Sequence, residues 1–307
     1  MGSQLNSAPK PSILDNMENL IALSKKLENV YNNRPDISTF EGAMYGTNQE
    51  NRYTKDAIKK DENYVEYRRN EIEKINHSKG MDVAERLEGG FQLSEIMQAM
   101  IVDRMNKNWF KDCKAIMTSD YDDLAVGIDA VMKHERGGYL GASFDFTLTN
   151  KDMMVDKKLN KEWENIKEGR VATVKYFEDP DTGKKGKLMV PKFIIGASKK
   201  DIEELAEAYL KNDNKVLENH PFKYVMLQQI EVQLNTVLEF YESNMDNEKY
   251  KFAKEQYDKV YKFLRIMKTD IHADDKMHDT DLHEYSKSNV ALDMMKRFQI
   301  MKDRPKP

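Results

Sequence analysis

The sequence predicts an α/β (α+β) protein whose core runs in the order helix, three-strand meander, helix, strand. Three observations support this prediction. Apolar residues recur at helical spacing over long stretches near both ends of the chain. Between 114 and 149, short apolar runs are separated by an Asp-rich turn and a Gly-Gly turn, which is typical of antiparallel strands. A further short apolar run, beginning at Lys192, supplies the fourth strand.

The composition is that of a protein with a highly ionic surface. The chain has 307 residues, which is enough to bury a sizeable core, and 33% of them are charged. No run approaches the roughly 20 apolar residues needed to cross a bilayer. The single cysteine excludes an intrachain disulfide. We therefore expect a cytoplasmic protein without membrane contact. Because the formal net charge is -4, any nucleic-acid binding must come from a local basic patch.

Two helices are predicted before the core. An amphipathic helix over 13–31 ends at an Asn-Asn-Arg-Pro stop. A second helix, over 52–77, is highly charged and carries only a thin apolar stripe. This second helix is either a solvated helix or, through basic residues that include Arg68 and Arg69, a face that contacts phosphates.

Each element of the predicted core has its own signal. The first helix shows apolar residues three and four apart, and the strands are bounded by turn residues. The predicted elements are a helix over 93–109, strands over 115–118, 126–132 and 140–148, a helix over 151–167, a charged hairpin over 171–187, a strand over 192–196 and a helix over 201–210.

The final third of the chain predicts a helical hairpin, with helices over 225–241 and 250–267. These patterns divide the chain into a disordered leader (1–12), an N-terminal helical extension (13–79), an α/β core (80–215), a C-terminal helical region (216–302) and a disordered tail (303–307).

Two of the three meander runs contain an acid. Asp129 lies in Gly-Ile-Asp-Ala-Val and Asp145 in Ser-Phe-Asp-Phe-Thr, both among residues typical of buried strands. An ionised carboxylate there is costly unless it is paired, hydrogen-bonded or metal-bound. Hard divalent cations take carboxylate oxygens, so these acids predict a site for Mg²⁺ or Mn²⁺. Glu95, near the start of the preceding helix, is expected to complete the ligand set.

The element order, together with Asp129 and Asp145, resembles the PD-(D/E)XK nuclease superfamily over about residues 80–210. The resemblance implies a restriction-endonuclease-like core in which both acids bind metal and a phosphodiester bond of DNA or RNA is hydrolysed. In that family a lysine two residues after the second acid positions or deprotonates the attacking water. Here Thr147 stands in that place. Some members supply the lysine from the following helix, where Lys158 is our first choice.

Two functions from different classes stay open. In the first, the chain is a Mg²⁺-dependent nuclease, or a degenerate relative that binds nucleic acid. In the second, it is a non-catalytic interaction protein, for example one of phage origin, whose long charged helices bind another protein. The absent motif lysine and the acidic net charge favour the second function, and the two strand-borne acids favour the first. The basic residues expected to contact the nucleic-acid backbone are Arg68, Arg69, Lys184, Lys185 and Lys187.

Every candidate acid also has a simpler interpretation. Asp129 and Asp145 are then strand acids that face water, and Glu95 is an acid favoured by the dipole at a helix N-terminus. Asp122 and Asp123 are interpreted first as turn formers, because Asp hydrogen-bonds its own backbone.

Overall fold

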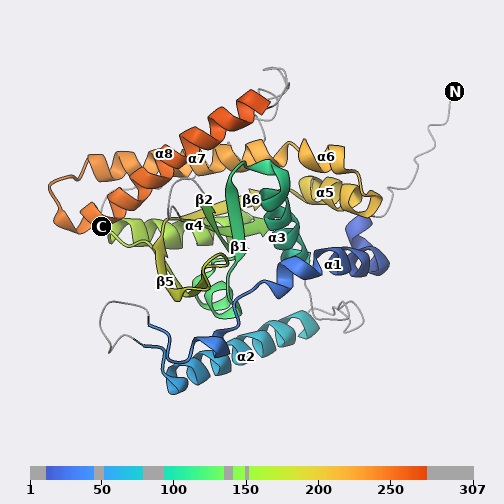
Figure 1. Cartoon of the computed structure of the whole chain (residues 1–307), viewed down its shortest axis with the longest axis horizontal. Helices are drawn as coiled ribbons and strands as arrows, with labels where there is room; N and C mark the ends of the chain where they lie inside the picture. Colours follow the sequence, from blue (N-terminus) through green and yellow to red (C-terminus); the bar gives the residue numbers. More distant parts are fainter. Residues whose placement is uncertain (1–11, 45–51, 79–92, 135–140, 149–151, 275–307) are drawn as a thin grey trace.

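A four-stranded mixed sheet lies among the helices of the chain (Figure 1). The computed structural model describes residues 12–44, 52–78, 93–134, 141–148 and 152–274. The strand order is β1-β2-β3-β6, with antiparallel pairing from β1 to β3 and parallel pairing between β3 and β6. The strands are β1 (Cys113–Met117), β2 (Ala130–His134), β3 (Ala142–Leu148) and β6 (Lys192–Ala197).

Helices surround this sheet, and a separate hairpin flanks it. Helix α3 packs on β1 and β3, whereas α4 and α7 pack on β6. The helices are α1 (Met17–Asn32), α2 (Lys55–Ser78), α3 (Leu93–Arg104), α4 (Asp152–Lys167), α5 (Lys199–Lys211), α6 (Asn214–Glu218), α7 (Phe222–Glu242) and α8 (Lys251–Asp274). The hairpin joins β4 (Ala172–Glu178) to β5 (Lys185–Val190). The predicted α/β class is therefore confirmed, and the elements follow one another in the predicted order.

The strand predicted over 126–132 is partly wrong. Residues Asp122–Val126 form one turn of π-helix, Gly127 ends it with a φ of 72°, and β2 begins only at Ala130. The buried carboxylate of Asp122 holds this turn in place by accepting hydrogen bonds from backbone N–H groups of β4 at 2.6 and 3.0 Å. Asp129 consequently lies one residue before β2, where its own N–H donates to the Phe144 carbonyl at 2.8 Å.

Side-chain amides cover both edges of the sheet. At the β1 edge, the Asn106 amide accepts from the Ala115 N–H at 2.6 Å and donates to the Ala115 carbonyl at 2.9 Å. At the β6 edge, Gln229 of α7 makes the same pair of bonds with Gly196, and Gln233 makes it with Ile194. An amide carries both a donor and an acceptor, so it replaces a neighbouring strand at that residue.

One hydrophobic core joins distant parts of the chain. Leu23 and Leu27 of α1 belong to the same buried cluster as Phe144 of β3 and Phe263 of α8. A smaller cluster of Phe40, Tyr53, Ile58 and Tyr176 docks α2 on β4. The domain boundaries at 79/80 and 215/216 stay a prediction. Within the described ranges, no helix combines the length and apolarity that crossing a membrane requires.

Candidate functional site

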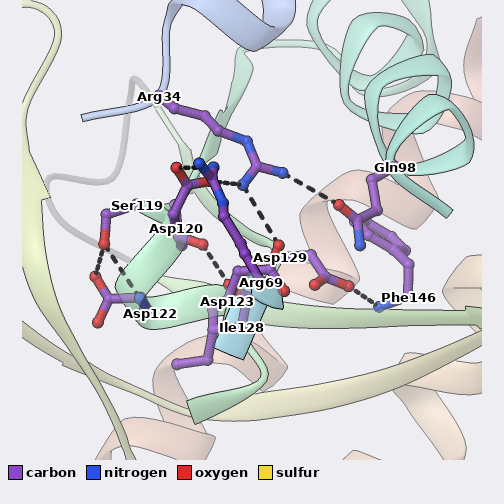
Figure 2. A network of polar contacts seen from close by, with 11 residues as sticks. Arg34, Arg69, Gln98, Ser119, Asp120, Asp122, Asp123, Ile128, Asp129 and Phe146 are labelled. Atoms are coloured by element: carbon purple, nitrogen blue, oxygen red, sulfur yellow. Dashed lines mark hydrogen bonds and ion pairs between the residues drawn. The ribbon is translucent and has the colours of Figure 1, made fainter. Parts of the chain in front are cut away.

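Asp129, one residue before β2, lies beside Asp145 of the adjoining strand β3. Each is only 3% exposed. The Asp129 carboxylate accepts a hydrogen bond from the backbone N–H of Phe146, the residue directly after Asp145, at 2.6 Å (Figure 2). Gly127 also lies against Asp145, because a Cβ at Gly127 would come within 3.2 Å of an Asp145 carboxylate oxygen. The segment before β2 is thus fitted closely to both acids.

Lys158 reaches these acids from helix α4. Its ammonium group donates to the Asp145 carboxylate and lies 3.4 Å from the Phe146 carbonyl oxygen. Glu162, one helical turn further along α4, lies on the same face of the helix. The ammonium group of Lys192 of β6 lies between the carboxylates of Asp145 and Glu162, at 3.8 and 3.4 Å. Four charges therefore alternate in sign across the interface between α4 and the sheet.

The environment of Lys158 keeps its ammonium group protonated. Burial alone lowers the pKa of this lysine, but the negative charges of Asp145 and Asp129 outweigh that effect, and the pKa is raised overall. A lysine with a raised pKa is a poor proton acceptor at neutral pH. Lys158 is consequently suited to orient a water molecule or to stabilise negative charge, and it is unsuited to remove a proton.

Asp123 forms a carboxyl pair with Asp129. The two carboxyl groups lie close enough to interact by hydrogen bonding. Burial raises the pKa of Asp129 well above its usual range, and the nearby charges of Asp123 and Asp145 raise it further. Burial also raises the pKa of Asp123, although Arg34 opposes that shift. Burial therefore disfavours the form of this pair in which both carboxyl groups are ionised.

Arg34 joins the segment after α1 to this acidic region. Its guanidinium group lies 2.9 Å from Asp120 and 3.4 Å from Asp123, and it donates to the Gln98 side chain of α3 at 3.3 Å (Figure 2). Arg69 of α2 binds the other oxygen of Asp120 at 2.6 Å. The segment after α1 and helix α2 are thereby tied to Asp120 and Asp123, which precede β2.

The remaining predicted ligand, Glu95, lies in the first turn of α3. Burial raises the pKa of Tyr31, and the negative charge of Glu95 raises it further. Glu95 also adds to the effect of Asp123 and Asp120, which outweigh burial and raise the pKa of Arg34. Glu95 therefore belongs to the region around Arg34. Asp129, Asp145 and Lys158 are the predicted site residues that the structure brings together most closely.

The predicted backbone-contacting residues separate into three places. Arg69 borders the acids through Asp120, whereas Arg68 pairs with Glu71 of its own helix at 2.7 Å. Lys184 and Lys187 are exposed in the β4–β5 hairpin. Lys185 donates to the carbonyl of Thr39 at 3.0 Å, so it fixes the hairpin to an N-terminal turn. Of these five residues, Arg69 has the contact that reaches the acidic region.

Several residues of the site carry weak sequence signals. From the sequence, Arg34 belongs to a helix stop because it precedes a proline. Asp123 is interpreted as a turn former and Glu162 as an acid on a helix surface. Lys192 had a usable signal, because it leads directly into the apolar run Phe-Ile-Ile and must therefore bury its charge. The same argument that singled out Asp129 and Asp145 applies to Lys192.

The described residues contain no group of three or more His, Cys, Asp or Glu side chains that could hold a metal ion. Comparisons of the chain with protein-family models, with curated proteins and with solved structures found no match. Any functional conclusion therefore depends on the geometry of the site itself.

Proposed function

We propose that this chain is a Mg²⁺-dependent nuclease with a core of PD-(D/E)XK type, which hydrolyses phosphodiester bonds in DNA or RNA. The observation that carries the proposal is the contact between Lys158 of α4 and Asp145 of β3. It supplies, from the following helix, the cation that the motif position Thr147 lacks. The helix–strand order and the parallel pairing of β3 with β6 support the same proposal at the level of the fold.

The donor set suits a hard cation. Mg²⁺ is commonly held by one or two carboxylates, with water and substrate phosphate oxygens completing the octahedron. Asp129 and Asp145 supply two carboxylates at adjoining positions, and Asp123 lies beside Asp129. Burial and like charges raise the pKa of Asp129. A divalent cation beside this carboxyl group would favour its ionised form. When bound, the ion would activate water and offset charge on the phosphate.

The surrounding residues hold this arrangement in place. The Phe146 N–H fixes the orientation of the Asp129 carboxylate, and Lys192 anchors Asp145 from β6. Protonated Lys158 would orient the attacking water or stabilise the negative charge that develops on the phosphate oxygens. We assign Asp129 and Asp145 to metal binding and Lys158 to water or phosphate. Water and substrate phosphate oxygens would supply the other ligands of the ion.

A cleavage assay tests this proposal. Labelled single- and double-stranded DNA and RNA are incubated with the full chain in Mg²⁺, Mn²⁺ or EDTA. We expect cleavage that requires the metal and falls about 100-fold or more in Asp129→Asn and Lys158→Met, because charge stabilisation in a buried site is lost. Asp246→Asn, which changes an exposed acid in the turn after α7, is the matched control and retains activity. Cleavage absent under every condition, or equal in all variants, contradicts the proposal.

The alternative is a non-catalytic interaction protein. It is favoured by the pairing of the buried acids, since Asp145 binds Lys158, Asp129 binds the Phe146 N–H and Asp123 binds Arg34. Satisfied polar networks of this kind also serve to rigidify a fold. If this alternative holds, Asp129→Asn changes stability without any nuclease activity being present to lose. The unmodified chain and Asp129→Asn are therefore compared both in the cleavage assay and by thermal unfolding. A change in melting temperature without cleavage by either protein favours the interaction protein.

A further inference from the structure

Two arginines from separate parts of the chain meet on a single carboxylate. Arg34 comes from the segment after α1, and Arg69 comes from the middle of α2. The Arg34 guanidinium lies 2.9 Å from one oxygen of Asp120, and the Arg69 guanidinium lies 2.6 Å from the other oxygen (Figure 2). Asp120 is therefore held between two planar cations, one for each of its oxygens.

The surroundings of the two arginines differ. The Arg34 side chain is 13% exposed and is fixed further by Gln98 and Asp123. The Arg69 side chain is 60% exposed, and that of Asp120 is 38% exposed. One arginine is thus held rigidly at the acidic region, while the second arginine and the carboxylate between them are accessible to a ligand from solvent.

A carboxylate between two guanidinium groups presents the same pattern of acceptors as a phosphate group. Guanidinium binds both anions through parallel hydrogen bonds, and arginine is favoured over lysine where such planar recognition is needed. An exposed ion pair such as that of Arg69 with Asp120 contributes little to folding, so its exchange for another anion has a low cost. Asp123 links the pair to the carboxyl group of Asp129.

We propose that Arg34 and Arg69 form a clamp for one backbone phosphate of a nucleic acid, and that Asp120 occupies this clamp until the nucleic acid displaces it. The inference rests on the proposed function, because the clamp lies beside the acids assigned to hydrolysis. The clamp assigns phosphate binding to Arg69, which the sequence suggested, and to Arg34, which it did not. Asp120 then weakens binding to any ligand that does not displace it.

Binding of a short fluorescein-labelled DNA or RNA strand, measured by fluorescence anisotropy in EDTA over a series of salt concentrations, tests the clamp. We expect Arg69→Gln to weaken binding and to lower the slope of log K against log salt by about one, as the loss of one phosphate contact requires. Arg265→Gln, at an exposed position of α8, removes the same charge elsewhere and leaves the slope unchanged. An equal slope and affinity in Arg69→Gln and the unmodified chain overturn the clamp.

The reverse substitution gives the sharper result. Asp120→Asn frees both arginines, so binding tightens, and it tightens more than in Asp246→Asn, which removes an exposed acid after α7. The gain depends on Arg69, so it largely disappears when Asp120→Asn is combined with Arg69→Gln. A gain that matches the Asp246→Asn control, or that persists without Arg69, overturns the clamp. The substitutions are made at Arg69 because Arg34 is largely buried, so replacing Arg34 would also impair folding.

The clamp and the proposed hydrolysis fail in different ways. Cleavage that depends on Asp129 but is indifferent to Arg69 and Asp120 removes the clamp and keeps the nuclease. Binding that depends on Arg69 without any cleavage keeps the clamp and removes the nuclease. If the unmodified chain binds none of the DNA or RNA strands, both proposals are overturned.

Discussion

At the scale of single residues, Lys192 is the residue on which the buried charges depend. It lies between Asp145 of β3 and Glu162 of α4, and all three side chains are almost inaccessible to solvent. Removing one charge of a buried set leaves its partner uncompensated, which costs far more than the intact set contributes. The contact of Lys158 with Asp145 accordingly depends on the neighbouring charges of Lys192 and Glu162.

We expect Lys192→Met to lower the free energy of unfolding by about 3 kcal/mol, because Glu162 then lacks its cation. Combining Lys192→Met with Glu162→Gln removes both charges, so the double variant is less destabilised than the two single variants added together. Urea unfolding of the four proteins measures this coupling. Strict additivity contradicts the coupling of these two charges.

His220 gives the chain a predictable response to acid. It is buried against Trp109, and its Nδ1 accepts a hydrogen bond from the Phe222 N–H at the start of α7. Burial lowers the pKa of His220 from 6.5 to about 4. The unfolded chain therefore takes up a proton on this histidine at a higher pH than the folded chain does. The stability from neutral His220 is complete above pH 6.5 and is lost as the pH falls towards 4.

A shift of this size corresponds to about 3 kcal/mol, since each pKa unit is worth about 1.4 kcal/mol. Asn at position 220 keeps an acceptor for the Phe222 N–H and does not titrate. Unfolding free energies measured by urea between pH 4 and pH 7 are expected to fall more steeply for the unmodified chain than for His220→Asn. Parallel pH profiles contradict this assignment.

The sequence identifies single residues where the local pattern is unusual. Asp129 and Asp145 stand out because each interrupts an apolar run, and Lys158 follows from the helix after Asp145. Arg34 and Asp123 do not stand out, because their importance depends on the docking of α1 and of the turn before β2. That docking involves partners more than 60 residues apart in the chain, such as Arg34 and Gln98, and no local pattern records it.

At the scale of elements, the sheet edges show how the core avoids open strands. The amides of Gln229 and Gln233 are four residues apart on α7, so they lie on one face and meet alternate residues of β6. We expect Gln233→Leu to lower the free energy of unfolding by about 2 kcal/mol, because the Ile194 N–H and carbonyl lose their partners.

Gln228→Leu is the matched control for this edge. Gln228 precedes Gln229 on α7, and within the described part of the chain its side-chain oxygen has no hydrogen-bond partner. Because this buried oxygen has no partner among the described residues, Gln228→Leu breaks none of its hydrogen bonds, and we expect no loss of unfolding free energy. Equal effects of the two substitutions in chemical unfolding contradict a role for Gln233 at the sheet edge.

Element type was more predictable than element limits. Helical periodicity identified α1, α3, α4 and α7, and turn residues identified the β4–β5 hairpin. The strand predicted over 126–132 begins too early, because the carboxylate of Asp122 binds the backbone of β4 and holds residues 122–126 in a π-helical turn. Likewise α3 gives way to a π-helical segment at Met105–Trp109, which contains Asn106 and its bonds to β1. Both differences arise from hydrogen-bond partners that lie outside the segment itself.

At the scale of the whole molecule, the N-terminal helices belong to the structure that holds the site. Leu23 and Leu27 of α1 are fully buried in the main core. Arg34, in the segment after α1, contacts Asp123, and Arg69 of α2 contacts Asp120. We expect the fragment 80–307 to melt at a lower temperature than the full chain, or to fail to fold, because it loses this buried surface. Circular dichroism during heating measures this. A fragment that melts like the full chain supports an independent extension over 13–79.

The most direct measurement is the position of a bound metal in crystals grown with Mn²⁺. The anomalous signal of the ion locates it independently of any assumed site. We predict a peak bonded to carboxylate oxygens of both Asp129 and Asp145, with the Lys158 ammonium group close to it, and loss of that peak in Asp129→Asn. A chain that binds Mn²⁺ only elsewhere, or that keeps Asp145 on Lys158 and Asp129 on the Phe146 N–H at saturating Mn²⁺, contradicts a metal-dependent nuclease.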